Sequence, residues 1–267
     1  MKLAYYTKKT SSLSDPRVVS MMDALRGGGV ALYPLESREN LQEKTDAVLA
    51  IGGDGTFLSA STIVHGTGVP LLGVNLGRLG FLSENKPEDV AEPLLKGDFK
   101  VEPRTMLKVS CDGKSTHALN EVAVSRLSAA MLGIDVCLDG QPLPTYWADG
   151  LLISTSSGST AYSLSVGGPI CTPQSRVLII APVAPHNLNV RPLVVPETSG
   201  ITIKLHSRDG KFVLAADNVN SIESGDSEVE VCASSQPLGI VTLGKSSFIE
   251  ALRTKLFWGE DVRNSKD

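Results

Sequence analysis

The chain has 267 residues, of which 42% are apolar and 20% are charged, a balance typical of a globular protein. Its formal net charge of −4 disfavours DNA or RNA binding, because proteins that bind polyanions through their overall field are usually basic. No apolar run is long enough for a membrane span or a signal peptide. The four cysteines share no CxxC spacing, which disfavours a zinc site or a disulfide framework and predicts buried thiols. We therefore expect a cytoplasmic protein.

The first third of the chain alternates short apolar runs with helical patterns. In its first expected helix, Pro16 lies in the first turn, and Gly27 to Gly29 follow the end, as helix boundaries favour. Alternating strands and helices predict a parallel sheet that is covered on both faces. The expected strands are residues 2–6, 30–33, 47–51 and 70–74, and the expected helices are residues 15–26 and 57–64.

From about residue 100 the pattern changes to strands that are separated by turn signals such as Asp112-Gly113 and Asp139-Gly140. We predict an α/β domain with a parallel sheet over residues 1–99 and a β-rich, sandwich-like domain over residues 100–244. The segment 245–267 is expected to contain an amphipathic helix, at 246–257, that packs on the first domain. The strands expected in the second domain are residues 105–111, 115–125, 134–138, 150–155, 177–181, 200–205, 211–215, 228–233 and 239–243.

The most informative motif is Gly52-Gly53-Asp54-Gly55-Thr56, which follows an apolar strand and precedes a helix. Glycines at the end of a strand let the chain turn and let a ligand approach the backbone, and the N–H groups of a helix N-terminus favour phosphate. An Asp among such amides can accept a proton from a hydroxyl nucleophile or hold Mg²⁺. Alone, the motif also fits a turn with a helix-capping Asp.

A second glycine-rich turn, residues 73–82, follows the next expected strand. Two adjacent glycine-rich strand ends would form the floor of a crevice. Asn75 and Arg78 are candidate ligand contacts in this turn. Arg78 either faces phosphates or is simply exposed, and the sequence leaves both alternatives open.

The pair Asn120-Glu121 is a candidate for binding a ribose. Inside a strand the two side chains would face opposite ways, whereas at the end of a strand both can reach one ligand. Glu121 can then accept hydrogen bonds from ribose hydroxyls. A solvated pair on a sheet edge is the alternative.

The longest polar segment begins at Asp149-Gly150, continues through an apolar strand and becomes rich in Ser, Thr and Gly. Small residues let a planar base lie near the backbone, and hydroxyls and Asp149 can bind amide or purine edges. The candidate contacts in this segment are Asp149, Ser157, Thr160, Ala161, Tyr162 and Ser165.

Other motifs carry less weight. Residues 239–246 match the P-loop pattern in letters, but the four residues between its glycines are β-prone, so we predict a strand there. The chain has no G-x-G-x-x-G, which disfavours an ordinary dinucleotide-binding dehydrogenase. Its histidines show no metal-ligand spacing, so no protein metal site is predicted.

Four segments in this order resemble the NAD kinase family. They are Gly52–Thr56, Asn120-Glu121, Asp149-Gly150 leading into residues 158–163, and residues 185–196. The likeness covers most of the chain between about residues 46 and 196. The segment from Asp149 is the most specific, because lipid kinases and phosphofructokinases carry relatives of the first motif.

The resemblance implies an enzyme that phosphorylates the 2′-hydroxyl of the adenosine ribose of NAD with ATP, giving NADP. It implies an active site between an α/β domain and a β-rich domain, assembly as a homodimer or homotetramer, and a divalent cation such as Mg²⁺. Asp54 matches the family's proton acceptor, with Gly55 beside it in the phosphate-binding turn, and Asn120 and Glu121 match residues that hold the dinucleotide. The further NAD contacts that it implies are Asp149, Thr160, Ala161, Tyr162 and Ser165.

The chain departs from the family pattern at three places. It has Thr155-Ser156-Ser157-Gly158 where the family usually has Thr-Pro-Thr-Gly, and Asp217-Asn218 near the place of an Asp-Gly-Gln-like element. Trp147 stands where relatives often have a polar or basic residue. Two other functions remain open: a kinase of lipid or sphingoid alcohols, and a sensor that binds NAD or NADP without catalysis. The sequence also leaves open whether polyphosphate replaces ATP.

Overall fold

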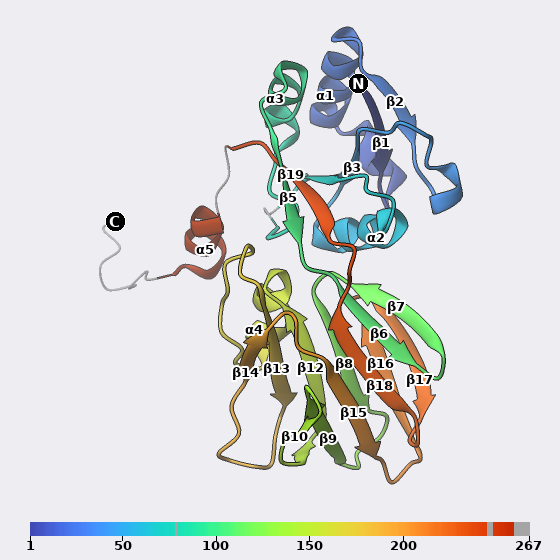
Figure 1. Ribbon diagram of the computed structural model, residues 1–267. Helices are drawn as coiled ribbons and strands as arrows, with labels where there is room; N and C mark the ends of the chain where they lie inside the picture. Colours follow the sequence, from blue (N-terminus) through green and yellow to red (C-terminus); the bar gives the residue numbers. More distant parts are fainter. Residues whose placement is uncertain (78–79, 245–247, 259–267) are drawn as a thin grey trace. The chain divides into compact units, whose positions relative to one another are not determined.

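The computed structural model describes residues 1–77, 80–244 and 248–258. The chain divides into two compact units, residues 1–103 with 238–267 and residues 104–237, whose elements are labelled in Figure 1. Each unit has its own hydrophobic core. Within the described residues, no helix is long and apolar enough to span a lipid bilayer.

The described part of the first unit contains a six-stranded sheet in the order β2-β1-β3-β4-β19-β5. Every pair from β2 through β19 in this order is parallel. The strands are β1 (Lys2–Tyr6), β2 (Ala31–Pro34), β3 (Ala47–Ile51), β4 (Leu71–Val74), β5 (Lys100–Arg104) and β19 (Leu238–Thr242). The helices are α1 (Pro16–Gly27), α2 (Asp54–Val64), α3 (Ala91–Lys96) and α5 (Phe248–Leu256), with short 3-10 turns at Thr10–Ser14, Arg38–Asn40 and Pro87–Asp89.

Helices cover both faces of this sheet, as the alternation of strands and helices predicts. On one face, Val18 of α1 and Leu94 of α3 share a core with Leu72 of β4. The next residue of β4, Gly73, points to the other face, where a Cβ on it would lie 3.1 Å from the Phe57 ring of α2. Because both faces are covered, all five residues of β3 are buried.

The second unit consists of two antiparallel sheets, as the β-rich pattern predicts. One has the order β10-β9-β15-β18-β6-β7, with β11 also paired to β9, and the other has the order β14-β13-β12-β8-β16-β17. The strands are β6 (Leu107–Cys111), β7 (Lys114–Ala118), β8 (Glu121–Arg126), β9 (Leu132–Leu138), β10 (Gln141–Pro142), β11 (Tyr146–Ala148), β12 (Gly150–Thr155), β13 (Val177–Val183), β14 (Leu193–Pro196), β15 (Ile201–His206), β16 (Lys211–Ala216), β17 (Val219–Ser224) and β18 (Glu228–Ala233). A 3-10 turn, η4 (Ser157–Thr160), and a short helix, α4 (Tyr162–Ser165), follow β12.

The core of the second unit lies between its two sheets. Val109 and Ile203 of one sheet pack in the same cluster as Ile153 and Leu214 of the other. The other face of β12 carries Leu152, which belongs to a separate apolar cluster against which Val166 packs. Strand β12 is therefore buried at all six positions, and this explains its continuous apolar sequence.

One expected strand, residues 115–125, is wrong as a single element. The structure divides it into β7, which pairs with β6, and β8, which pairs with β12 and β16 in the other sheet. The chain changes sheets at Leu119-Asn120, where the Asp217 carboxylate accepts backbone N–H groups that would otherwise join a strand ladder. The apolar pattern runs through the break because the side chains on both sides of it are buried.

The strand expected at residues 239–243 exists as β19, but it lies in the first sheet and not in the β-rich unit. It pairs in parallel with β4 through Ile240 and Leu71, and Val241 and Leu243 enter the core of the first unit. The expected helix at 246–257 is α5, and residues 245–247 lie outside the described residues. The expectation of buried thiols holds for Cys111, whereas Cys232 is exposed.

Candidate functional site

Asp54 begins α2, directly after the glycine turn that ends β3. Its Oδ1 accepts hydrogen bonds from the backbone N–H groups of Leu82 (3.1 Å) and Ser83 (2.9 Å), and its Oδ2 accepts one from Phe81 (2.9 Å). The second glycine-rich turn therefore holds this half-buried carboxylate in one orientation. It lies at the carboxyl end of a parallel sheet, which is where open α/β sheets bind ligands.

Close packing explains two glycines of the second turn. A Cβ on Gly80 would lie 1.7 Å from Oδ1 of Asp54, and a Cβ on Gly73 would lie 2.6 Å from Cα of Ser83. Gly80 leaves room for the carboxylate, and Gly73 lets the turn cross the end of β4. Sequence reasoning did not single out Gly80 or Ser83 as site residues, although the spacing of Gly77 and Gly80 in the motif was a signal.

Of the three glycines beside Asp54, the local structure requires only Gly52 to be glycine. Gly52 has a φ of 152°, and a Cβ on it would lie 2.4 Å from Oγ1 of Thr56, so the turn itself requires glycine there. Gly53 and Gly55 are exposed, and a Cβ on either would meet no described atom within 4 Å. Among the described residues no side chain caps the amino terminus of α2, so this end of the helix suits an anion.

Asn75 is buried and stabilises the second turn. Its Nδ2 donates to the carbonyl oxygen of Ser83 (3.1 Å), and its Oδ1 accepts from the backbone N–H of Gly77 (2.7 Å). Both ends of the carboxamide are thus bonded within the turn. Arg78, the other candidate of this segment, lies outside the described residues.

In the second unit, Asn120 and Glu121 lie where the chain leaves β7 and enters β8. The Asp217 carboxylate accepts the backbone N–H groups of Leu119 (2.7 Å), Asn120 (2.9 Å) and Glu121 (3.1 Å). The Asp217 backbone N–H donates to the Glu121 carbonyl oxygen at 2.9 Å. The pair therefore occupies a strand end, which is the alternative that lets both side chains reach one ligand.

The Ser/Thr-rich segment packs directly on this turn. Thr155 donates from its hydroxyl to the Leu119 carbonyl oxygen (2.6 Å) and from its backbone N–H to the Asn120 carbonyl oxygen (2.9 Å). A Cβ on Gly158 would lie 2.2 Å from the same oxygen of Asn120. Gly158 thus permits the close approach of the two segments, which brings the predicted Asn120-Glu121 and Ser157 contacts together.

Four buried polar atoms of these two segments have no hydrogen-bond partner among the described residues. They are Asn120 Oδ1, Glu121 Oε2, Ser157 Oγ and Ser163 Oγ. Buried polar atoms are rarely left unpaired, because each unpaired group costs free energy. Such a group of donors and acceptors indicates a site that a polar ligand completes.

The Glu121 carboxyl group has an unusual proton affinity. Burial and, after it, the neighbouring Asp217 carboxylate raise its pKa to about 7, although the backbone N–H of Tyr162 acts in the opposite direction. Burial also raises the pKa of Asp217, against the effect of the three backbone N–H groups. At neutral pH Glu121 can therefore donate as well as accept a hydrogen bond.

The remaining predicted contacts of the Ser/Thr-rich segment differ in how far they are exposed. Thr160 and Ala161 are half-buried, while Tyr162 and Ser165 of α4 are exposed. These four residues form one continuous segment after β12.

Asp149 lies at the opposite end of β12 from the Asn120-Glu121 turn. Its carboxylate forms an ion pair with Arg126, with Nε and Oδ1 3.1 Å apart. In the sheet Ser154 pairs with Glu121 and Gly150 pairs with Ser125, so five residues of strand, about 17 Å, separate Asp149 from the Glu121 position. The structure does not bring Asp149 together with the other candidates.

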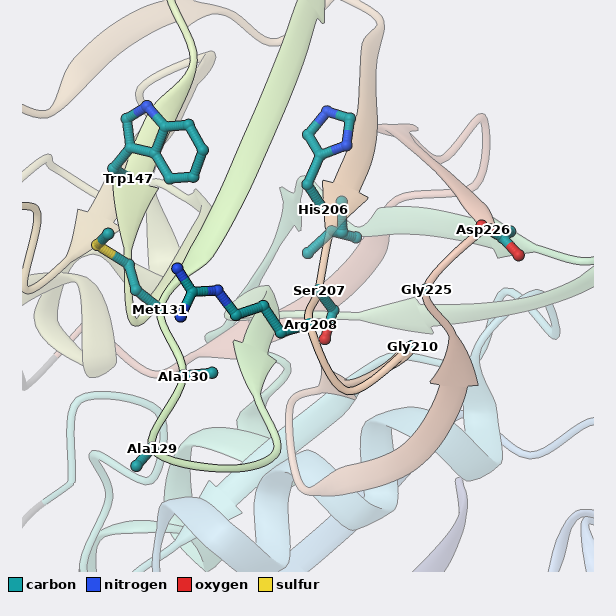
Figure 2. Close-up of a pocket in the computed structure, with 11 residues that line it drawn as sticks. Ala129, Ala130, Met131, Trp147, His206, Ser207, Arg208, Gly210, Gly225 and Asp226 are labelled. Carbon is teal, nitrogen blue, oxygen red and sulfur yellow. The ribbon is translucent and has the colours of Figure 1, made fainter.

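A separate cavity of about 630 Å³ in the second unit lies beside Trp147. Its lining includes Met131, Trp147, His206, Arg208 and Asp226 (Figure 2), and none of the predicted site residues lines it. His206 is hydrogen-bonded to Asp135, with Nε2 and Oδ2 2.7 Å apart.

Comparison with known proteins shows similarity over both units. Residues 19–96 match the family model for the ATP-NAD kinase N-terminal domain, and residues 119–243 match that for the ATP-NAD kinase C-terminal domain. An NAD kinase of Flavobacterium psychrophilum is 38% identical over 238 residues, which are 85% of this chain and 81% of that protein. An NAD kinase of Bacteroides fragilis is 43% identical over 226 residues, which are 82% of this chain and 78% of that protein.

Two solved structures resemble the fold. The yeast NADH kinase complexed with NADH superimposes with a TM-score of 0.87 over 100% of this chain and 90% of that chain, at 24% identity, and this likeness shows the fold alone. An NAD kinase from Archaeoglobus fulgidus in complex with ATP has a TM-score of 0.77 and 27% identity, over 92% of this chain and 95% of that chain.

Proposed function

The chain belongs to the ATP-NAD kinase family, and we propose that it transfers the γ-phosphate of ATP to the 2′-hydroxyl of the adenosine ribose of NAD, giving NADP. The observation that carries the proposal is the Asp54 carboxylate, which three backbone N–H groups orient at a glycine-rich strand end. A non-catalytic sensor would not need an oriented carboxylate at this position.

Asp54 is the proton acceptor in this proposal. Each carboxylate oxygen has two lone-pair directions; Oδ1 accepts two backbone N–H groups and Oδ2 accepts one. One direction on Oδ2 is thus left for the hydroxyl group of the acceptor sugar. As the oxygen of that hydroxyl attacks the γ-phosphorus, its proton passes to Oδ2 and the bond from the γ-phosphorus to the leaving oxygen breaks.

The turn around Asp54 suits the triphosphate of the donor. Gly53 and Gly55 are exposed and packing does not require them, so they leave the backbone open to phosphate oxygens. The uncapped amino terminus of α2 favours negative charge at the same place. Fixed dipoles of this kind stabilise the charge of a transferring phosphoryl group.

The Asn120-Glu121 turn and the Ser/Thr-rich segment bind the dinucleotide in this proposal. Their unpaired polar atoms would be satisfied by ribose hydroxyls and by the edge of a base. Asp149, about 17 Å away along β12, would bind a different part of an extended dinucleotide. Thr160, Ala161, Tyr162 and Ser165 would line the segment that follows β12.

A divalent cation fits the described residues as a partner of the substrate. Around Asp54 the described residues contain no cluster of three or more His, Cys, Asp or Glu ligands. Mg²⁺ commonly binds through one or two carboxylates together with substrate phosphates and water, and Glu84, in the same turn as Ser83, is the carboxylate that would hold it. The ion would neutralise charge on the phosphates, and Asp54 would remain available to the hydroxyl group.

The finer features of the family are proposals as well. We expect a homodimer or homotetramer in the cytoplasm, and polyphosphate is an alternative donor. Light scattering of the purified chain and fractionation of cells would test the first two expectations.

The deciding experiment is an assay of NADP formation. Purified protein would be incubated with NAD and Mg²⁺ and with ATP, GTP or polyphosphate in turn, and a sphingoid alcohol would replace NAD in a parallel reaction. We expect NADP from NAD and no phosphorylation of the alcohol. If the protein binds NAD but consumes no donor, it is a sensor, and if only the alcohol is phosphorylated, the proposed acceptor is wrong.

A further inference from the structure

Helix α5 presents one face to the glycine-rich turn that holds Asp54. Phe248, Ala251, Leu252 and Lys255 recur at a spacing of three, four and seven residues and therefore share a face. Ala251 and Leu252 are buried, and the Phe248 ring lies 6.3 Å from the Phe81 ring, centroid to centroid. The helix belongs to the same unit as Asp54.

Lys255 places an ammonium group inside this contact. Its Nζ lies 4.0 Å from the centroid of the Phe81 ring and is buried, with no hydrogen-bond partner among the described residues. An ammonium group has three N–H donors, and the face of an aromatic ring attracts its charge without satisfying them. A buried charge in this condition is costly unless something else pairs with it.

The ammonium group is close to the proposed proton acceptor. Phe81 donates its backbone N–H to Oδ2 of Asp54 and carries Lys255 over its ring. Burial lowers the pKa of Lys255, and the charges of Asp54 and Glu84 act in the opposite direction. These two carboxylates are thus near enough to influence the ammonium, yet neither is hydrogen-bonded to it.

A second unpaired donor lies directly after the glycine-rich turn, at Ser83. The hydroxyl of Ser83 is buried without a partner among the described residues, while its backbone N–H donates to Oδ1 of Asp54. Both unpaired groups are therefore next to the Asp54 carboxylate's partners: the hydroxyl belongs to Ser83 itself, and the ammonium of Lys255 lies over the ring of Phe81. A simple helix anchor would not leave both groups unpaired.

We propose that Lys255 binds an oxygen of the ATP phosphates beside Asp54, with the Ser83 hydroxyl as a second donor. The inference rests on the proposed function, because it assigns to the same site a positively charged side chain that binds the donor nucleotide. Lysine is a common ligand for phosphate, which it recognises as a compact charge. Phosphate oxygens accept hydrogen bonds from the N–H and O–H groups that the protein leaves unpaired. Both groups lie beside residues that hold Asp54, and in the proposed reaction the phosphate nearest to Asp54 is the γ-phosphate of the donor, so Lys255 assists the binding of the donor and not that of NAD.

The test compares Lys255→Met with Arg253→Met, which removes the same charge from the exposed side of the same helix. We expect Lys255→Met to raise the KM for ATP at least tenfold and to leave the KM for NAD within twofold. Arg253→Met should change neither constant by more than twofold. Lys255→Arg, which keeps the charge, should recover part of the loss, and Ser83→Ala should raise the KM for ATP by a smaller factor, about threefold.

Thermal unfolding with and without ATP separates this role from a structural one. A buried charge without a partner costs free energy, and Met is an apolar side chain of similar length, so the Tm of Lys255→Met without ATP should not fall. The rise in Tm that ATP produces in the unmodified protein should become smaller. A lower Tm without ATP together with an unchanged KM for ATP would show that Lys255 only anchors α5, and this would overturn the inference.

The proposed function and the inference about Lys255 can fail independently of each other. If the unmodified protein forms no NADP but its Tm rises with ATP, the acceptor is wrong, and the same variants still test whether Lys255 binds the nucleotide. If Lys255→Met keeps both the KM for ATP and the ATP-induced rise in Tm, the inference about Lys255 is wrong and the kinase activity is unaffected.

Discussion

Asp54 in the first unit and Asp217 in the second are held by the same hydrogen-bond pattern. In each case one carboxylate oxygen accepts two backbone N–H groups and the other accepts one, from three consecutive residues: 81–83 for Asp54 and 119–121 for Asp217. The difference lies in which side of the hydrogen bonds would contact the ligand in the proposed function. The turn at 81–83 orients the Asp54 carboxylate itself, the proposed proton acceptor, whereas the Asp217 carboxylate orients the turn that carries Asn120 and Glu121, the proposed dinucleotide contacts. Under this proposal the same local geometry supports a catalytic group in one unit and a positioning group in the other.

The substitution Asp54→Asn tests most directly whether the two carboxylates have different roles. The variant should lower kcat by about 10²–10⁴-fold, because it removes the proposed proton acceptor. Steady-state rates of NADP formation would measure the loss, and circular dichroism would check that the fold persists. A variant that keeps a near-normal rate would remove Asp54 from the proposed role.

Gly80→Ala tests whether the orientation of Asp54 matters. The new Cβ would lie 1.7 Å from Oδ1 of Asp54 and would displace the carboxylate, and a displacement of about 1 Å can cost about 100-fold in rate. The matched control is Gly77→Ala in the same turn, where the nearest described atom would be 3.9 Å away. If both substitutions changed kcat equally, the orientation of the Asp54 carboxylate would not explain the loss of rate.

Asp217→Asn should act mainly on dinucleotide binding. The amide nitrogen of Asn cannot accept a hydrogen bond, so at least one of the backbone N–H groups of residues 119–121 loses its partner and the turn loosens. We expect the KM for NAD to rise about tenfold, equivalent to about 1.4 kcal/mol, with a smaller change in kcat. A fall in kcat at an unchanged KM for NAD would assign Asp217 a catalytic and not a positioning role.

Glu121→Gln tests the smallest effect, the dependence of stability on pH. The carboxyl pKa is raised from 4.5 to about 7 in the folded chain, so between these values the folded state binds more protons than the unfolded state. The free energy of unfolding should therefore fall as pH rises from about 4.5 through about 7. In Glu121→Gln this decrease should be smaller.

Urea denaturation of both proteins at several pH values between 5 and 8 would measure this difference. The burial that raises the pKa of Asp217 acts in the same direction, so some decrease should remain in the variant. Identical pH profiles for the two proteins would contradict a buried Glu121.

Local patterns were sufficient to predict the kinds of elements around Asp54, although α2 begins at Asp54 and not at the expected residue 57, because the glycine turn is shorter than the motif indicates. The apolar run of β3, the glycine turn and the start of a helix are contiguous in the chain, so the strand-turn-helix geometry could be derived from spacing alone. In α1 the Asp15 side chain accepts a hydrogen bond from the Arg17 backbone N–H, as expected for an N-cap, and Pro16 follows it.

Exposed strands such as β17 were missed, because its six mostly polar residues lack an alternating pattern.

Residue patterns along the chain predicted the two kinds of domain, the strand-turn-helix at Asp54 and the family, because periods of two and 3.6 residues and short motifs are local properties. Three features emerged only from the folded chain: β19 joins the first sheet, Asp217 orients a turn 96 to 98 residues away, and Lys255 lies over Phe81. These contacts depend on how strands are ordered and in which register they pair. No short stretch of sequence contains that information, since the partners meet only when the whole sheet has formed.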